Sequence, residues 1–423
     1  MLLMLLSPVW TEILAPHHVE IPTVKEPVVW RADLDEAFAL AHDLDRPVFV
    51  TLRCLPCEQC ADFDRDVLDG GEALTPLLSR FVCVRLTDAQ ALDLSIFPAD
   101  GFQDFDLSWW GYFMSPDRET YGIFGGRDDI GESTRISEAA LVATLRRVLE
   151  HHHDPARPTW GIDGPTPATT VARTPASLPG FASWRRRAPQ EEVSASCIHC
   201  HQVGEILRQP AIDDGTFVPE RDLEIWPLPE NVGLSLDRDH GLRVTAVVPG
   251  SAAARAGIEV GDVLGAAGGR RLFGQADFRG VLHREAKPEG TIEIWWTRGD
   301  TVHSGDLVLE REWRRTVLDW RMSVSQGNIG APPSIGWPLP GPKAGQGSMS
   351  VKPWFGKHAE RSLAWQAGLR PHHVIVAVDG ASPDVTGRAF MTWFRLGHDR
   401  GDEVVLSVLD RGERREIRYR LAE

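Results

Sequence analysis

Residues 47–60 read PVFVTLRCLPCEQC, and this stretch decides the fold of the N-terminal third of the chain. Its first six residues form a short, nearly continuous apolar run, which is typical of a strand buried in a parallel sheet. Phe63, Val67 and Leu68 follow at helical spacing. The pattern therefore predicts that the cysteines of this stretch lie at a junction between a strand and a helix.

The flanking segments extend this unit into an α/β domain over residues 28–153. Leu34, Ala37, Phe38 and Ala41 lie at i, i+3, i+4 and i+7, which is one apolar stripe of an amphipathic helix. The other expected elements are a strand over 81–86, a β-hairpin over 109–114 and 120–124, and a closing helix from about Ser137.

The composition excludes two broad classes of protein. The 423 residues include 60 acidic and 45 basic side chains, so the chain lacks the basic footprint of a nucleic-acid-binding protein. No stretch approaches the roughly 20 apolar residues that span a bilayer. Residues 1–15 resemble the tail of a secretory signal without its basic segment, and an ordinary N-terminal tail would look the same.

The six cysteines are clustered rather than scattered. A three-residue step occurs three times, at Cys54/Cys57, Cys57/Cys60 and Cys197/Cys200. Such spacing is typical of redox, metal or haem chemistry. The sixth, Cys83, lies in an apolar strand and is expected to be a small buried hydrophobe.

The first cluster has the arrangement of a dithiol exchange site. A cysteine in the first turn of a helix is stabilised as a thiolate by the free N–H groups there, which makes Cys57 the nucleophile. Cys60, one turn later, can resolve a mixed disulfide. In these features residues 28–153 resemble the thioredoxin superfamily, and the resemblance implies a thiol or disulfide partner.

Three positions depart from that family's pattern. Aligned on the two cysteines, Thr51 replaces a buried acid, Pro56 replaces a tryptophan, and Ser108 replaces a cis-proline. Cys54 also adds a third thiol, so a metal or cluster site made by Cys54, Cys57 and Cys60 is an alternative. An inert scaffold with structural cysteines is another.

The second cluster, Cys197-Ile198-His199-Cys200-His201, resembles the haem attachment segment of c-type cytochromes. The resemblance implies haem c as cofactor, with thioether bonds to Cys197 and Cys200 and with His201 as the iron ligand. A second dithiol pair, a zinc knuckle and a purely structural role are the alternatives.

The C-terminal half contains an internal repeat. AARAGIEVGDVLGAAGG (253–269) is similar to AWQAGLRPHHVIVAVDG (364–380), and a helical stretch and two strands follow each copy. Both copies resemble PDZ domains, which implies that Val232, Gly233 and Leu234 form a loop that binds the C-terminus of a protein or peptide. The sequence shows no Ser, His and Asp motif of a PDZ-bearing protease.

The predicted organisation has six parts. They are an N-terminal tail or signal remnant (1–27), a thioredoxin-like domain (28–153), a Pro-rich extended linker (154–182), a haem c-like segment (183–229) and two PDZ-like domains (230–312 and 313–423). His151–His153 are expected at the surface, and the 15 Trp are expected to pack in cores.

Taken together, the chain resembles bacterial fusions of thioredoxin-like and PDZ domains, some of whose members are expected to carry selenocysteine. The resemblance implies a redox protein in the periplasm or another extracytoplasmic space, since covalent haem and stable disulfide exchange belong there. The alternative is a non-enzymatic scaffold that binds partners through its PDZ domains.

Overall fold

The computed structural model describes residues 10–11, 14, 27–53, 58–69, 73–97, 109–125, 137–161, 163–164, 174–187, 198, 200–284, 289–315, 318, 349–350, 362–382, 387–398 and 401–421. The chain divides into two compact units, Met1–Thr316 and Val317–Glu423. Within the described residues, no helix is both long and apolar enough to cross a membrane.

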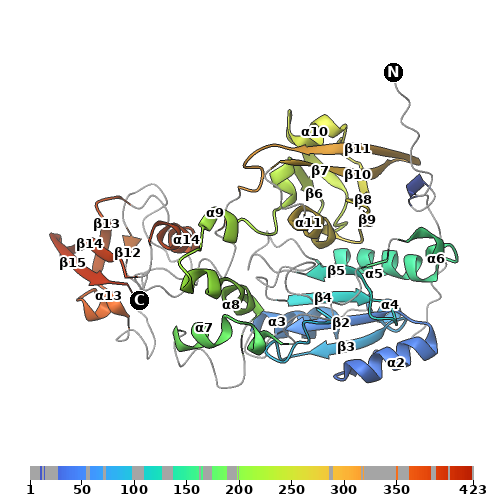
Figure 1. The fold of residues 1–423 in the computed structure, drawn as a ribbon, viewed down its shortest axis with the longest axis horizontal. Coiled ribbons are helices and arrows are strands. Elements are labelled where there is room, and N and C mark those ends of the chain that lie inside the picture. The colour runs from blue at the N-terminus through green and yellow to red at the C-terminus, as the bar shows by residue number, and fades with distance from the viewer. Residues whose placement is uncertain are drawn as a thin grey trace. The chain divides into compact units, whose positions relative to one another are not determined.

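The N-terminal domain (residues 27–164) is built on a five-stranded sheet of order β1-β3-β2-β4-β5 (Figure 1). Parallel pairing joins β1 (Trp30–Arg31), β3 (Val82–Leu86) and β2 (Val48–Arg53), whereas β4 (Trp109–Met114) and β5 (Thr120–Gly125) form an antiparallel hairpin. The predicted strands and hairpin are confirmed, and β1 is an additional short strand.

The predicted helices of this domain begin at side-chain caps. Asp33 accepts a hydrogen bond from the Glu36 N–H before α2 (Leu34–Leu44), and Ser137 accepts one from the Ala140 N–H before α5 (Glu138–His153). Between them lie α3 (Glu58–Phe63), a π-helix η1 (Asp64–Leu68) and α4 (Thr75–Leu78). Apolar side chains of α3, η1, α4 and α5 share one core with Phe49 and Phe113 of the sheet.

The segment that follows departs from the predicted extended linker. Its described parts form α6 (Arg157–Trp160), η2 (Pro175–Ser177) and the start of α7 (Phe181–Arg187), and α8 (Cys200–Asp213) and α9 (Pro219–Asp222) come after it. Trp160 explains the first difference, because its ring is buried against Trp10 and Trp295. Burying a large aromatic side chain outweighs the preference of a Pro-rich stretch for solvent.

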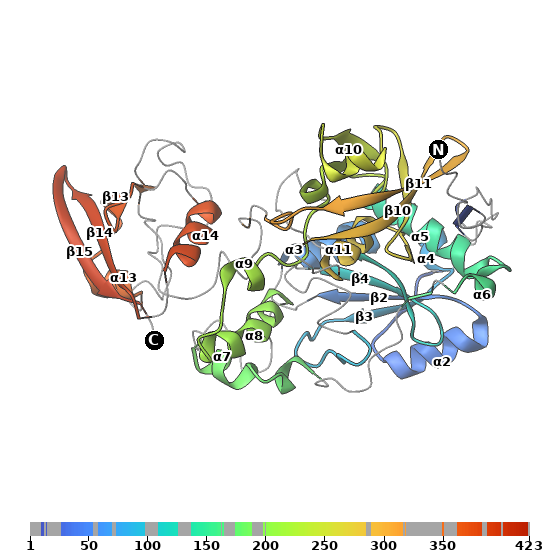
Figure 2. The same ribbon diagram turned by 45° about the horizontal axis from the view of Figure 1, so that its top comes forward.

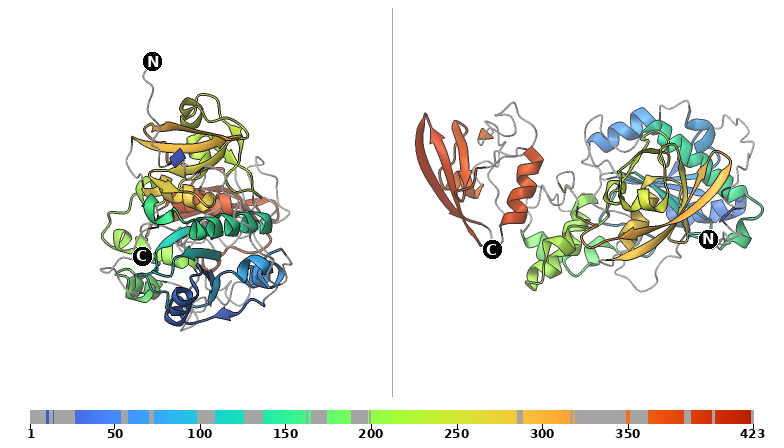
Figure 3. Two further views of the ribbon diagram at one scale, coloured as in Figure 1. Left: turned by 90° about the vertical axis from the view of Figure 1, so that its right-hand side faces the viewer. Right: turned by 90° about the horizontal axis from the view of Figure 1, so that it is seen from above.

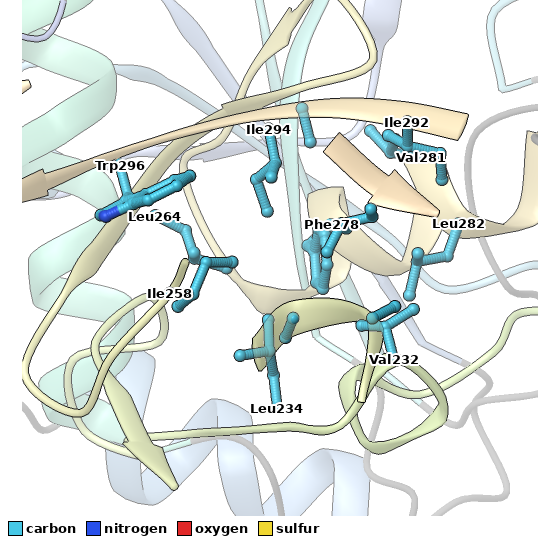
Figure 4. Close-up of a cluster of buried hydrophobic side chains, with 14 of the residues drawn as sticks. Val232, Leu234, Ile258, Leu264, Phe278, Val281, Leu282, Ile292, Ile294 and Trp296 are labelled. Atoms are coloured by element: carbon cyan, nitrogen blue, oxygen red, sulfur yellow. The ribbon is translucent and has the colours of Figure 1, made fainter. Parts of the chain in front are cut away.

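The first repeat domain (residues 229–315) contains two sheets. A four-stranded sheet has the order β11-β10-β8-β9, and β6 pairs with β7. The elements are η3 (Pro229–Val232), β6 (Leu234–Leu236), β7 (Val244–Val247), α10 (Ala252–Ala256), β8 (Val263–Ala267), β9 (Arg270–Arg271), α11 (Gln275–Arg284), β10 (Gly290–Arg298) and β11 (Thr301–Leu309). Figure 4 shows its core, in which Phe278 of α11 faces Ile294 and Leu234.

The second repeat domain (residues 349–421) repeats this order of elements around its own core. A short helix α13 (Leu363–Gln366), a strand β13 (His373–Val378), a helix α14 (Gly387–Gly397) and a hairpin of β14 (Glu403–Asp410) and β15 (Glu413–Arg420) follow β12 (Met349–Ser350). The sheet order is β12-β13-β14-β15, and the internal sequence repeat therefore corresponds to a repeated arrangement.

The first repeat domain is joined to the N-terminal domain along β5, the edge strand of the five-stranded sheet. Arg270 donates from Nη2 to the carbonyls of Thr120 and Tyr121, both at 2.8 Å, and the Ile123 N–H donates to Asp277 Oδ1 at 2.8 Å. Helix α11 lies beside β5 (Figure 1), and Figures 2 and 3 show the repeat domain stacked on the N-terminal domain in other views. The sequence analysis did not predict this joint.

Two further contacts close the joint. Phe273 is 2% exposed and belongs to the apolar core of the N-terminal domain. Asp277 Oδ2 accepts the N–H groups of Phe273 and Gly274 at 2.9 Å each. Burial raises the pKa of the Asp277 carboxyl to about 6, although Arg270 and these N–H groups favour its charged form. The joint is thus a buried, hydrogen-bonded contact.

Candidate functional site

The first cysteine cluster lies between two described elements. Strand β2 ends at Arg53 and α3 begins at Glu58, as the sequence predicts. Cys54 and Cys57 lie outside the described residues, and Cys60 is described only as a backbone position on α3. The nearest described side chains on either side of the cluster are those of Arg53 and Ala61.

A buried carboxylate, that of Asp64, contacts several side chains next to the cysteine cluster. Asp64, the first residue of η1, is 3% exposed. Its Oδ2 accepts a hydrogen bond from Arg53 Nε at 2.6 Å, and Arg85 Nε lies 3.5 Å from the same oxygen. Its Oδ1 accepts from the Trp109 indole at 3.3 Å. The sequence analysis missed Asp64, although its position four residues after Cys60 was a signal that it could share a helix face with the motif.

Arg85 is itself held in place from two sides. Its guanidinium makes two hydrogen bonds to Asp69, at 2.9 and 3.2 Å, and lies 4.2 Å from the centre of the Trp30 ring. Such two-pronged contacts fix orientation as well as charge. The charged groups at this end of the sheet are therefore ordered rather than solvated at random.

Strands β2 and β3 place two buried side chains, Thr51 and Cys83, in the sheet. Thr51 is fully buried, and its hydroxyl donates to the Val84 carbonyl at 3.4 Å. The prediction for Cys83 is confirmed, since it is 2% exposed and burial raises the pKa of its thiol. The buried acid of the family pattern is thus absent from β2, and Asp64 supplies one from the helix side.

Cys200 of the second cluster lies near the N-terminal domain. Cys200, the first residue of α8, is 1% exposed. The pKa of the Tyr112 hydroxyl on β4 is raised well above its usual value, first by burial and then by the nearby Cys200. Cys197 and His199 lie outside the described residues, as does the side chain of His201.

These surroundings bear on the predicted haem. The residue types Cys, Cys and His are the donors that haem c requires. A thioether to Cys200, however, needs an open face beside the sulfur, and the Cys200 side chain is enclosed by protein near Tyr112. In the described structure, attachment of a porphyrin to Cys200 would therefore require the residues that enclose this side chain to move apart.

The predicted carboxylate-binding loop is a turn between η3 and β6. Val232 and Leu234 are each 1% exposed and point into the core of the repeat domain (Figure 4). Gly233 has φ +84°, and an added Cβ would lie 2.2 Å from Ser251, so this position requires glycine. The Gly233 N–H donates to the Glu230 carbonyl at 3.0 Å.

The expectation that His151–His153 lie at the surface is wrong for the first two. His151 is 1% exposed and donates to Asp163 at 2.7 Å, and His152 Nδ1 lies 2.9 Å from the Tyr121 hydroxyl. The closing helix α5 ends against the joint, where the ring of His151 packs on Phe273. Tertiary packing therefore overrides the position of these residues at a helix end.

One histidine and aspartate cluster was also missed by the sequence analysis. His372, His373 and Asp410 bring their possible ligand atoms within 4.8 Å of one another. The Arg370 N–H donates to His373 Nδ1, which places the proton of a neutral ring on Nε2, and Arg415 already pairs with Asp410 at 2.9 Å. The contacts describe an ion-pair network better than a metal site.

Comparison with protein families finds one match in the N-terminal domain and one in the first repeat domain. Residues 29–104 match a model described as thioredoxin-like, and residues 243–289 match a PDZ domain. The chain contains a thioredoxin-like domain and a PDZ domain. A search of curated proteins finds no match. The matched regions include Asp64 and the joint helix α11, whereas β5 lies beyond the end of the thioredoxin-like match.

Proposed function

We propose that this protein exchanges thiols and disulfides at Cys57 and Cys60 and uses its PDZ domain to bind the protein partner. The observation that supports it is the placement of the motif between β2 and α3 inside the thioredoxin-like match. Cys57 immediately precedes α3, which continues into η1, and the N–H groups at such a helix start favour a thiolate.

The proposed reaction has two balanced steps. The Cys57 thiolate attacks a partner disulfide, forms a mixed disulfide and releases one partner thiolate. Cys60, as a thiolate, then attacks the Cys57 sulfur, which releases the second partner thiolate and leaves a Cys57–Cys60 disulfide. Two electrons pass to the partner, and a dithiol reductant restores the pair.

The partner is proposed to bind to the first repeat domain through a free C-terminal carboxylate. In the described structure β6 pairs with β7 alone, which leaves one edge of β6 for an added peptide strand. The joint at β5 ties this domain to the thioredoxin-like sheet, so a bound partner would stay close to the cysteines. Tethering of this kind raises the effective concentration of the disulfide.

An extracytoplasmic location and a covalent haem remain predictions from the sequence. Both resemblances favour an oxidising compartment. A pyridine haemochrome spectrum of the protein, expressed with haem maturation machinery, tests the haem. An unmodified peptide around Cys197 and Cys200 in a mass spectrum would contradict it.

The exchange reaction is tested by alkylation and by insulin reduction. We expect Cys57 to react with iodoacetamide well below pH 8, because its thiolate is stabilised. Cys57→Ser should abolish insulin reduction. Cys83→Ala, which changes a buried thiol away from the motif, is the matched control and should retain the activity.

The binding function is tested by changing the peptide and not the protein, because a side chain added at Gly233 would clash with Ser251. A peptide with a free C-terminus should bind, and the same peptide with an amidated C-terminus should not. If the carboxylate peptide binds while Cys57 behaves as an ordinary thiol, the exchange proposal is wrong and the scaffold alternative holds.

A further inference from the structure

Asp64 contacts side chains from three of the strands near the cysteine motif. It lies on η1 and contacts Arg53 at the end of β2, Trp109 at the start of β4 and Arg85 on β3. Arg53 and Trp109 face each other across the β2–β4 pair. One carboxylate therefore links three strands to the helix that carries Cys60.

The contact between Arg53 and Asp64 joins the two elements that flank the motif in the sequence. Arg53 immediately precedes Cys54, and α3 begins one residue after Cys57. The hydrogen bond of 2.6 Å between Arg53 Nε and Asp64 Oδ2 therefore connects the residue before Cys54 with the helical segment after Cys60. A π-helix adds a residue to a helical turn and is often found at functional sites, and here it begins at Asp64.

The charges in this contact are shielded from water. The side chain of Asp64 is 5% exposed and those of Arg53 and Arg85 are 16% and 20% exposed. With Asp69, the group contains two positive and two negative charges. Removing one partner of such a buried pair leaves the other without compensation, so the local potential at the motif depends on Asp64.

We propose that Asp64 is a positioning residue for the cysteine site, one that fixes Arg53 beside the motif and sets the local charge that Cys57 experiences. This inference rests on the exchange function proposed above. Thr51 leaves β2 without an acid, and Asp64 provides a buried carboxylate from η1. It acts through Arg53 and through the helix that carries Cys60.

The test is the pH dependence of Cys57 alkylation, measured by mass spectrometry of the full chain. Asp64→Asn removes a negative charge, so the midpoint should fall by about half a pH unit. Arg53→Gln removes a positive charge and leaves Asp64 paired with Arg85 alone, so the midpoint should rise by a similar amount. Asp66→Asn is the matched control, since Asp66 carries the same charge on the same helix but is exposed and pairs with Arg65.

Opposite shifts in the Asp64 and Arg53 variants, with no shift in the Asp66 variant, would support the positioning role. A merely structural role would lower thermal stability and leave the midpoints unchanged, which would overturn it. If Asp64→Asn does not fold, an unshifted Arg53→Gln profile overturns it equally. A wild-type Cys57 that reacts only above pH 8 contradicts the exchange function itself, and the positioning role with it.

Discussion

His152 is an imidazole that this fold keeps neutral. Its ring contacts the Tyr121 hydroxyl at 2.9 Å and the Asp45 carbonyl at 3.3 Å. Burial, followed by the charges of His153 and Arg157, lowers the pKa of His152 to about 4. In the unfolded chain this histidine has the ordinary pKa of about 6.5. Between pH 6.5 and pH 4, proton binding therefore favours the unfolded chain over the folded one.

The resulting pH dependence has a definite sign. The stabilisation is present above pH 6.5 and is lost as the pH falls toward 4, because the unfolded state binds the proton first. Between pH 7 and 4, the wild-type chain should lose about 3 kcal/mol more unfolding free energy than His152→Gln. Urea unfolding of both proteins measures this difference, and parallel pH curves would contradict the prediction.

At the scale of elements, strand β5 lacks a side chain where it meets the repeat domain. A Cβ on Gly122 would lie 2.9 Å from Phe273 Cδ2 and 3.1 Å from Asp277 Oδ2. Neither neighbour is free to move, since Phe273 is packed in a core and Asp277 is hydrogen-bonded to three N–H groups. Glycine here permits the close approach of two domains.

Gly122→Ala should therefore destabilise the protein by about 1–3 kcal/mol, the usual cost of overpacking. Gly290→Ala is the control, because an added Cβ there meets nothing within 4 Å. Thermal unfolding of the two variants gives the comparison. Equal melting temperatures would mean that the joint adapts to the extra methyl group.

The elements also show how far the sequence could be interpreted. Helices α2 and α5 were predictable because a capping Asp or Ser precedes a regular apolar stripe. Strand β1 and the π-helix η1 were not, because a two-residue strand and an inserted helical residue leave no periodic pattern. Asp64 was missed because the thioredoxin pattern places the buried acid on the strand, and Thr51 occupies that position in this chain.

The joint was invisible in the sequence because its contacts join residues about 150 positions apart, such as Thr120 and Arg270. Local patterns indicate that a segment is half-buried but not which domain covers it. The same limit applies to Cys200, whose motif predicted the chemistry of a haem donor but not its enclosed position beside Tyr112.

At the scale of the molecule, the joint predicts that the N-terminal domain and the first repeat domain unfold together. Phe273→Ala should break this coupling, since it removes a side chain that crosses from one domain into the core of the other. Hydrogen exchange of β2 and β10 in rising urea is the measurement. Both strands should open together in the wild type and at different urea concentrations in the variant.

Phe113→Ala serves as the control for that experiment. Phe113 is fully buried in the N-terminal core, and its loss should lower the stability of β2 and β10 by the same amount. If the two strands already open separately in the wild type, the joint does not couple the domains.

The contact at β5 also has a protective effect. Edge strands expose unpaired backbone groups to which other chains can add, and this is a common route to aggregation. Here the side chains of Arg270 and Asp277 occupy such groups on Thr120, Tyr121 and Ile123. The smallest stable fragment of this chain is therefore not the thioredoxin-like domain alone but that domain together with the first repeat domain, which covers its edge strand.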